Sequence, residues 1–300
     1  MLCVQAMHWC GSGRGAIARH MSQSEPVAQP RAFYDAAQPE RLGRARADFT
    51  LGLSRWRLAW RLAWLDIRNR YRGSVLGPFW LTLSTGVMLG GLGVLYSTLF
   101  QLSLREYLPH LAVSLVFWTL ISTLIIDATS SLTSAEAVIR QMQLPYTVHA
   151  LRGVMRNAIV AAHNLPLILV VFLLCGWVPG PEAALALVGL LILGVNAFAA
   201  TLFLGMLCAR FRDIGPIVGS VMQLAFFMTP VLWKPELLGE WQVFMPFNPF
   251  YALLETVRGP LVEGGGPWLA WVAALAYTAV HVGVAIAFFV RFRGRVAFWV

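Results

Sequence analysis

The sequence has few charged residues and a single lysine. Only 12% of its 300 residues are Asp, Glu, Lys or Arg, whereas 58% are hydrophobic. Because a soluble domain has roughly a quarter of its residues charged, the composition excludes an ordinary water-soluble protein and indicates an integral membrane protein. The one lysine, Lys234, is not preceded by the glycines of a phosphate-binding loop. The chain therefore cannot by itself hydrolyse ATP through such a loop.

Residue patterns typical of catalytic and metal sites are absent as well. The four cysteines are widely separated, so neither a disulfide framework nor a metal cluster is indicated. None of the six histidines has His-Glu-x-x-His or comparable ligand spacing, and no serine lies in a Gly-x-Ser-x-Gly turn. We therefore predict that this chain has no catalytic residues, no metal site and no bound cofactor.

Long apolar runs are the main feature of the chain. Four are uninterrupted and exceed the roughly 20 residues that span a bilayer core of about 30 Å, and two more are interrupted by polar residues or proline. The six runs are 76–100, 107–131, 153–177, 183–209, 214–233 and 267–290. We predict an all-α integral membrane protein in which residues 74–300 form one domain with six transmembrane helices, so that both termini lie on one side.

The basic residues predict which side that is. Of the 23 Lys and Arg residues, 20 lie at one face of the expected membrane domain, and only Arg105, Lys234 and Arg258 lie at the other. The positive-inside rule then places both termini in the cytoplasm. Because the net charge of +9 is spread over separated membrane edges, a nucleic-acid partner is not indicated.

The residues before the first span divide into two parts. Residues 1–50 are polar and have no apolar core, so we predict a disordered cytosolic extension without a signal peptide. Residues 51–73 place six apolar residues on one helical stripe beside several arginines, as expected of an amphipathic helix on the inner leaflet. The stripe consists of Leu53, Trp56, Trp60, Trp64, Ile67 and Tyr71. A soluble helix packed on a partner is the alternative, because several leucines form a second apolar face.

The cytosolic connection between the second and third spans contains a short helix candidate, 134–143, which Leu144 and Pro145 terminate. A link between helices normally needs only about 2–8 residues, so we expect another protein to dock here. Asp127 lies just before it, near the end of the second span. A carboxylate inside a membrane is a candidate for proton coupling, but pairing with Arg140 or Arg156 is the simpler expectation.

The segment after the fifth span, residues 228–251, is apolar yet contains four prolines. No continuous helix can cross it. Non-helical backbone at membrane depth must be shielded by protein or line a cavity, so we predict a pair of short helices that re-enter the outer half of the bilayer, with Glu255 or Arg258 reaching water. An amphipathic hairpin on the outer leaflet, anchored by Trp233, Trp241 and Tyr251, is the alternative.

Several segments in this order resemble one known family. They are "RYRGSVLGPFW" at 70–80, "IRQMQLP" at 139–145, "ARFRDIGPIV" at 209–218, "FFMTPVLW" at 226–233 and "FNPFYALLETVRGPL" at 247–261. Together they resemble the permease subunit of ABC-2-type exporters of polysaccharides, which move O-antigen, capsule or teichoic-acid chains. The resemblance covers roughly residues 50–300 and does not include the N-terminal extension.

This resemblance implies a homodimer in a bacterial inner membrane, with two separate ATPase subunits that bind ATP and Mg beneath it. The first and fifth spans would line an aromatic channel, the basic end of the interfacial helix would attract the lipid diphosphate, a cytosolic helix would couple to the ATPase, and the broken segment would form the outer gate. The channel candidates are Phe79, Trp80, Tyr96, Phe100, Phe226, Phe227 and Trp233, although aromatic residues also pack cores. The diphosphate candidates are Arg68, Arg70 and Arg72. The coupling candidates are Arg140, Gln141, Leu144 and Pro145. The gate candidates are Pro246, Asn248 and Pro249.

The expected substrate is therefore a polyprenyl-diphosphate-linked polysaccharide that leaves the cytosol in an ATP-driven step. Two alternatives stay open at this point. A drug or small-lipid exporter of the same architecture would have a small lateral cavity in place of a continuous aromatic channel. A membrane-embedded glycosyltransferase or acyltransferase would need paired acids or histidines at a membrane edge.

Overall fold

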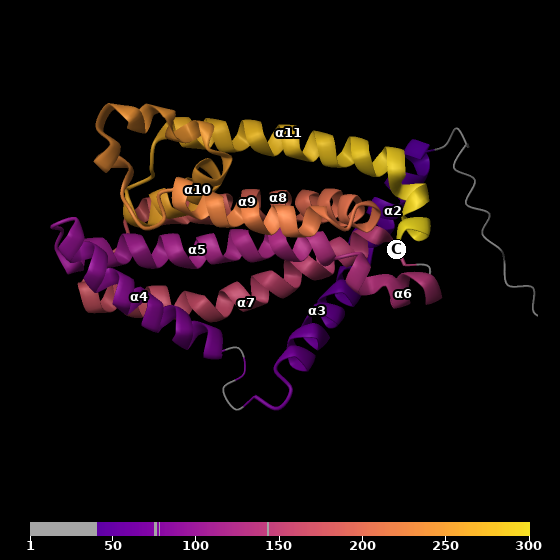
Figure 1. The fold of residues 1–300 in the computed structure, drawn as a ribbon, viewed down its shortest axis with the longest axis horizontal. Helices are drawn as coiled ribbons and strands as arrows, with labels where there is room; N and C mark the ends of the chain where they lie inside the picture. The colour runs from indigo at the N-terminus through magenta and orange to yellow at the C-terminus, as the bar shows by residue number, and fades with distance from the viewer. Residues whose placement is uncertain (1–40, 75–76, 78, 143) are drawn as a thin grey trace, which may run out of the picture. The chain divides into compact units, whose positions relative to one another are not determined.

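The computed structural model of the protein describes residues 41–74, 77, 79–142 and 144–300. Within these residues the regular secondary structure is entirely helical, and its long helices lie side by side (Figure 1). The α-helices are α2 (Arg41–Ser54), α3 (Trp56–Arg70), α4 (Phe79–Leu99), α5 (Leu104–Ser130), α6 (Glu136–Gln141), α7 (Tyr146–Cys175), α8 (Leu185–Arg210), α9 (Ile214–Met228), α10 (Pro249–Val262), α11 (Trp268–Phe292) and α12 (Val296–Trp299). The 3₁₀ helices are η1 (Thr133–Ala135), η2 (Pro181–Ala184), η3 (Pro235–Phe247) and η4 (Arg293–Arg295).

Five helical segments are long and apolar enough to cross a membrane. They are α4, α5, α7, η2 with α8, and α11 with its continuation to Trp299. The expected fifth span corresponds to α9, which has 15 residues. At 1.5 Å per residue α9 is about 22 Å long, shorter than a bilayer core of about 30 Å. The all-α membrane fold is confirmed, with five candidate spans and one shorter apolar helix in the described part of the chain.

The core lies around α5 and α8. In the apolar window of α5, 61% of the residues are buried, and in that of α8 50% are buried, against only 11% in α4. Helix α8 packs closely against α10 at Gly189, where a Cβ atom would overlap the carbonyl oxygen of Thr256. Helices α5 and α8 thus form the scaffold on which the other helices are placed.

Helices α4 and α9 are attached to this core by narrow contact faces. Only Leu89, Gly93 and Ser97 are buried in α4, and only Met222 and Ala225 in α9. In the Gly86-x-x-x-Gly90 spacing of α4, a Cβ atom at Gly86 would contact Leu167 of α7 at 3.4 Å, whereas one at Gly90 would meet nothing within 4 Å. Both helices therefore leave most of their apolar surface without a neighbour among the described residues.

Helix α2 corrects the predicted boundary of the N-terminal extension, of which residues 1–40 lie outside the described residues. Residues 41–50 are helical because α2 packs on the beginning of α7 through Asp48. The Asp48 carboxylate accepts hydrogen bonds from the backbone N–H groups of Tyr146 and Thr147, at 3.3 and 3.2 Å, and thereby caps α7. It also pairs with Arg293 at 2.8 Å. The polar composition of residues 41–50 reflects these contacts and not disorder.

Helix α3 is amphipathic, as predicted, but it has one face on protein. Its small buried face consists of Ala59, Ala63 and Ile67 and contacts α7. Trp56, Trp60 and Trp64 stay exposed on another face. Ile67 was expected on the tryptophan stripe and lies instead on the buried face, because it follows Ala59 and Ala63 at the four-residue spacing of one helical face. The exposed face that carries the three indoles is the one that suits the headgroup layer of a membrane.

The proline-rich segment forms two helices, η3 and α10, that meet at Asn248. Of η3 only Pro235 is buried, whereas α10 packs against α5, α8 and α11 and is buried over most of its length. The expectation that Glu255 or Arg258 reaches water is wrong, since both are 0% exposed. The physical reason is that they neutralise each other, which permits a charged pair to enter the core.

Candidate functional site

The seven aromatic channel candidates separate into two groups by exposure. Phe79 and Trp80, at the beginning of α4, are each 58% exposed, and Phe227, near the end of α9, is 64% exposed. These three rings project from α4 and α9, two apolar helices of which only a few residues are buried. Phe79 also lies against His163 and Phe227 against Phe226, with ring centroids 5.6 and 5.2 Å apart. Their exposed faces can still stack on a flat partner such as the C–H face of a sugar ring, or face lipid.

The other four aromatic candidates pack within the chain. Tyr96 lies against Phe100 with ring centroids 5.5 Å apart, and Phe226 lies against Trp118 at 5.8 Å. Trp233 is half-buried and directs its indole N–H to the carbonyl oxygen of Phe227, 3.5 Å away. All four belong to the layer around the main hydrophobic core. Their contacts give them a packing role that the sequence pattern did not distinguish from a channel role.

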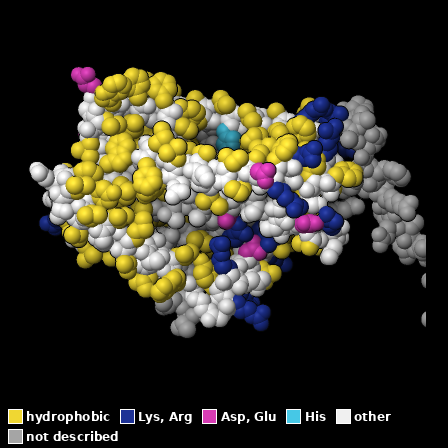
Figure 2. Space-filling model, in the orientation of Figure 1, with side chains coloured by type: hydrophobic (Ala, Val, Ile, Leu, Met, Phe, Trp, Pro, Cys, Tyr) yellow, Lys and Arg dark blue, Asp and Glu magenta, His cyan; other side chains and the backbone are white. Residues whose placement is uncertain are grey.

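The three arginines expected to attract a lipid diphosphate are exposed. Arg68 and Arg70 lie in the last turn of α3, and Arg72 follows it. Cations at a helix C-terminus are stabilised by the helix dipole, and guanidinium groups suit phosphate oxygens. Figure 2 shows that most visible Lys and Arg side chains gather toward the end of the bundle that carries α2, α3 and α6, while hydrophobic side chains cover much of the remaining face.

An ionic cluster that includes Asp66, two residues before Arg68 in α3, joins α3, α5 and α7. We name it the Asp66 cluster. Asp66 of α3 accepts a bidentate pair of hydrogen bonds from Arg152 of α7, of which the Nε bond is 2.7 Å long. Arg156 of α7 donates to Asp127 of α5 at 2.7 Å, and Asn157 donates to the same oxygen at 2.9 Å. Asp127 therefore has a structural partner, and of the two expected, the partner is Arg156.

The expected docking helix is shorter than the sequence suggested. Helix α6 covers only Glu136–Gln141, follows a 3₁₀ turn, and has no buried residue. Arg140 pairs with Glu136 at 2.8 Å and donates to the carbonyl oxygen of Val300 at 3.0 Å. Leu144 is half-buried, and Pro145 is buried as the N-cap residue of α7. The exposed part of the expected docking segment thus consists of α6, whereas Pro145 belongs to the start of the next helix.

The gate candidates lie where η3 meets α10. The Asn248 side-chain oxygen accepts hydrogen bonds from the N–H groups of Phe250 and Tyr251, at 2.9 and 3.3 Å, and its amide donates to the carbonyl oxygen of Met228 at 3.3 Å. Asn248 therefore caps α10 and ties it to the end of α9. Pro246 lies in the last turn of η3, and Pro249 is the first residue of α10, where its missing N–H is not needed.

A second ionic cluster, the Arg258 cluster, was not predicted from the sequence. Arg258 pairs with Glu255 one turn earlier in α10 and donates to the hydroxyl of Ser114 at 3.2 Å and to the carbonyl oxygen of Pro230 at 2.6 Å. Its Nε lies 3.4 Å from Glu263. The acid three residues before an arginine, on one helical face, was the sequence signal that could have found the pair. Since Arg258 and Glu255 are fully buried, these two side chains can hold elements together but cannot reach a substrate.

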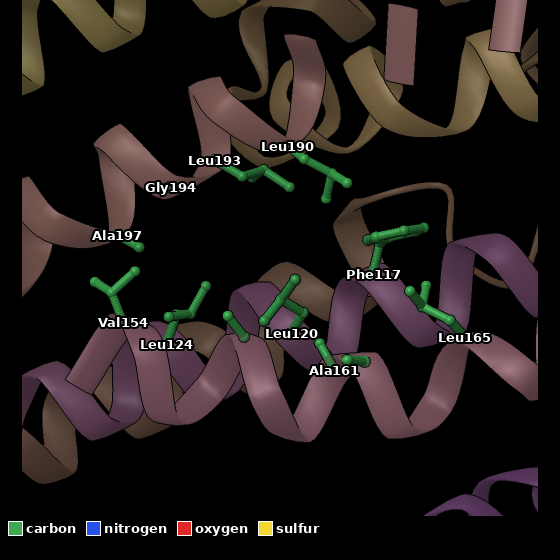
Figure 3. A pocket seen from close by; sticks show the side chains of 12 residues that line it. Phe117, Leu120, Leu124, Val154, Ala161, Leu165, Leu190, Leu193, Gly194 and Ala197 are labelled. Atoms are coloured by element: carbon green, nitrogen blue, oxygen red, sulfur yellow. The ribbon is translucent and has the colours of Figure 1, made fainter. Parts of the chain in front are cut away.

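Figure 3 shows an apolar groove between α5, α7 and α8 with a volume of about 230 Å³. Phe117 and Leu120 come from α5, Val154 and Leu165 from α7, and Leu190 from α8. Small residues on α7 and α8 leave the space open. With no polar side chain in its lining, the groove can accept only an apolar chain.

Comparison with known proteins agrees with this architecture. Residues 57–262 match the family described as ABC-2 type transporter. The chain is 27% identical over 222 residues to the O-antigen export system permease protein RfbA of Myxococcus xanthus, which covers 72% of this chain and 84% of that protein. It is 22% identical over 206 residues to an O-antigen export system permease protein RfbA of Klebsiella pneumoniae, which covers 66% of this chain and 78% of that protein.

Proposed function

The chain belongs to the ABC-2 type transporter family, and we propose that it is the membrane subunit of an ATP-driven exporter that moves a polyprenyl-diphosphate-linked polysaccharide, of O-antigen or capsule type, out of the cytosol. Two relatives named for O-antigen export support the class of substrate. The observation that carries the proposal is the exposure of aromatic rings on α4 and α9, two apolar helices of which only a few residues are buried.

A homodimer would complete the path. The exposed faces of α4 and α9 include open glycines and large apolar residues, which suit close packing against a second copy. With both faces turned toward a common axis, Phe79, Trp80 and Phe227 of each copy would border the same space. Aromatic rings stack on sugars without needing a particular sequence of hydroxyl groups, so such a path tolerates a repeating glycan.

Energy for the transfer would come from a separate ATPase that binds ATP and Mg. The exposed helix α6, with Arg140 and Gln141, is the surface we assign to that partner, and Leu144 lies at its edge. The chain holds one lysine and no phosphate loop. Docking of α6 would transmit closure of the ATPase to α5 and α7, between which it lies in the chain.

The orientation follows from the basic residues. In our proposal α9, extended by the residues up to Trp233, counts as the fifth of six spans, so both termini and the Arg68 end of α3 face the cytoplasm of a bacterial inner membrane. The diphosphate would approach Arg68, Arg70 and Arg72 there. On the opposite side α10 would be a re-entrant helix and Asn248, with Pro246 and Pro249, the outer gate.

One observation favours a second candidate, the export of a small lipid. A cavity of about 460 Å³, lined mainly by apolar side chains, lies among α5, α8, α9, α10 and α11. Such a space suits one lipid chain better than a glycan. A transferase has no comparable support, because Glu255 and Arg258, the charged pair at the centre of the Arg258 cluster, are fully buried.

Export of surface glycan by single-residue variants tests the proposal. We expect Trp80→Ala and Phe227→Ala to reduce surface glycan strongly while permease abundance and ATPase co-purification stay near normal, because these exposed rings contribute little to folding. The matched control is Phe298→Ala, which removes a ring that is 72% exposed but lies on α12. Normal glycan export in both path variants would refute the aromatic path.

The gate assignment has its own test. Pro249→Leu keeps a helix-compatible residue at an exposed position and should reduce export far more than membrane insertion or ATPase assembly. If abundance, ATPase co-purification and export fall together, Pro249 is a folding residue without a gating role.

A further inference from the structure

Two polar side chains near the middle of long helices, Asn196 of α8 and His281 of α11, line the cavity among α5, α8, α9, α10 and α11. Asn196 lies eleven residues after the start of α8, and His281 thirteen residues after the start of α11. At 1.5 Å per residue these are depths of about 17 and 20 Å, near the centre of a bilayer core of about 30 Å. Both residues line the cavity.

The hydrogen bonds around Asn196 fix the direction in which every group donates. The carbonyl oxygen of Ile192 can only accept, so the atom 2.9 Å from it must be the amide nitrogen of Asn196. The same nitrogen donates to Thr278 at 2.7 Å, since the Thr278 hydroxyl gives its own proton to the carbonyl oxygen of Ala274 at 2.6 Å. The side-chain oxygen of Asn196 is thereby left to accept from His281.

The position of the proton on the His281 ring follows from these hydrogen bonds. Its Nδ1 lies 3.1 Å from the Asn196 side-chain oxygen and must carry the proton. When the ring has one proton, Nε2 is then a hydrogen-bond acceptor, and no described residue donates to it. The hydroxyl of Tyr277, another polar group of the lining, already donates to the carbonyl oxygen of Phe247 at 2.9 Å. His281 Nε2 is therefore an acceptor without a donor among the described residues, on a side chain that lines the cavity.

The rest of the lining restricts the ligand. No Lys, Arg, Asp or Glu is among the described residues that line the cavity, so a phosphate or carboxylate would find no counterion. The cavity has a volume of about 460 Å³. At about 30 Å³ for a group the size of a water molecule, it has room for about 15 such groups. These features match one neutral chain with a hydrogen-bond donor.

We propose that this cavity binds a neutral single-chain lipid alcohol, such as a fatty alcohol or a short prenol, whose hydroxyl donates to His281 Nε2. The apolar side chains of α5, α9 and α10 surround the chain, and Asn196 holds the imidazole so that Nε2 faces the hydroxyl. An unpaired acceptor in hydrocarbon is unfavourable, and the bound hydroxyl relieves that cost. The site is separate from the aromatic path and does not depend on the proposed export function.

Photolabelling of the full-length permease in phosphatidylcholine nanodiscs tests this site. The probe is a long-chain alcohol with a diazirine, and the matched probe is its methyl ether, which has no donor. We expect saturable labelling of α8 or α11 peptides by the alcohol, with a preference of about fivefold over the ether, as one net hydrogen bond would give. Peptides identified by mass spectrometry report the position, and unlabelled alcohol should compete.

Four variants make the result specific. His281→Phe should abolish the preference for the alcohol while weak ether labelling persists, and His281→Gln, which can donate to Asn196 and still accept, should retain much of it. Ala200→Phe, which fills the cavity, should remove labelling by both probes. His163→Phe changes a histidine of α7 that does not line this cavity and should change nothing.

Two results would overturn the proposal. Equal labelling by the alcohol and the ether in the unaltered protein would mean that only a lipid chain enters. Absence of saturable labelling in α8 and α11 of protein that elutes as a folded species would mean that the cavity is closed to lipid, for example by a second copy of the chain.

Discussion

The Asp66 cluster and the Arg258 cluster use the same kinds of side chains in different surroundings. In the Asp66 cluster the paired groups, Asp66, Arg152, Arg156 and Asp127, keep between 19% and 24% of their side-chain surface exposed. In the Arg258 cluster, Arg258 and Glu255 are 0% exposed. The two clusters also lie toward different ends of the bundle, one at α3 and the other at α10 (Figure 1).

This difference determines what each cluster can do. A pair that keeps about a fifth of its side-chain surface exposed is partly solvated and screened, so it contributes modestly and tolerates movement. A buried pair contributes little net stability, but the loss of one partner leaves an uncompensated charge and is very costly. The Asp66 cluster therefore suits a contact that tolerates movement between α3 and its neighbours α5 and α7, and the Arg258 cluster suits a rigid anchor.

The largest effect should come from Arg258→Met. It leaves Glu255 buried without its cation and frees the carbonyl oxygen of Pro230, so we expect a loss of about 3–5 kcal/mol of stability and low abundance of folded permease. Thermal unfolding in detergent and fluorescence size exclusion measure this. The double variant Arg258→Met with Glu255→Leu should recover a large part of the loss. If the double variant is no better than the single one, uncompensated charge is not the cause.

A smaller effect is expected for Arg156→Met in the Asp66 cluster. Water can solvate Asp127 and Asp66 after the change, and Arg152 still pairs with Asp66, so we expect a loss of roughly 1–2 kcal/mol. The loss should shrink in high salt, whereas that of Arg258→Met should not. Unfolding temperatures of both variants at low and high salt test the contrast. Equal losses with equal salt dependence would remove the distinction between the clusters.

Glu263, which lies in the loop after α10, gives the Arg258 cluster a dependence on pH. Burial would raise the pKa of Glu263, but its hydrogen bond to His110 and the charge of Arg258 outweigh burial and lower this pKa from 4.5 to about 2. A lowered pKa stabilises the fold above about pH 4.5 and loses that contribution as the pH falls toward 2. We expect on the order of 2 kcal/mol, measured as a steeper loss of unfolding temperature between pH 5 and pH 3 than in Glu263→Gln. Parallel curves for the two proteins would contradict this.

The smallest effect on stability should come from Arg140→Ala. Arg140 is 63% exposed and its pair with Glu136 is a surface pair, so the unfolding temperature should hardly change. Because α6 is the proposed docking surface, co-purification of the ATPase should nevertheless fall. Ala137→Ser, at another exposed position of α6, is the matched conservative control. Unchanged co-purification with Arg140→Ala would exclude Arg140 from the docking contact.

Local patterns identified several features of the fold and the site. The break between η3 and α10 was predicted from Pro246 and Pro249, because proline cannot continue a helix, and it lies between Phe247 and Pro249. The pairing of Asp127 with Arg156 was one of two expected partners. The exposure of the aromatic candidates could not be predicted from the sequence. Phe227 is exposed and Phe226 is half-buried, because neighbouring residues of a helix face different surroundings.

By itself, the sequence determined that the chain is a helical membrane protein, because apolar runs of this length can satisfy their backbone groups in a bilayer only as helices. Its motifs also pointed to the family. Only the tertiary structure decided which charges are buried and paired. Asp48 pairs with Arg293, 245 residues later in the chain. The hydrogen bonds that leave His281 Nε2 without a donor depend on α8 and α11 lying side by side. Such contacts arise from packing between helices, which no local period in a sequence encodes.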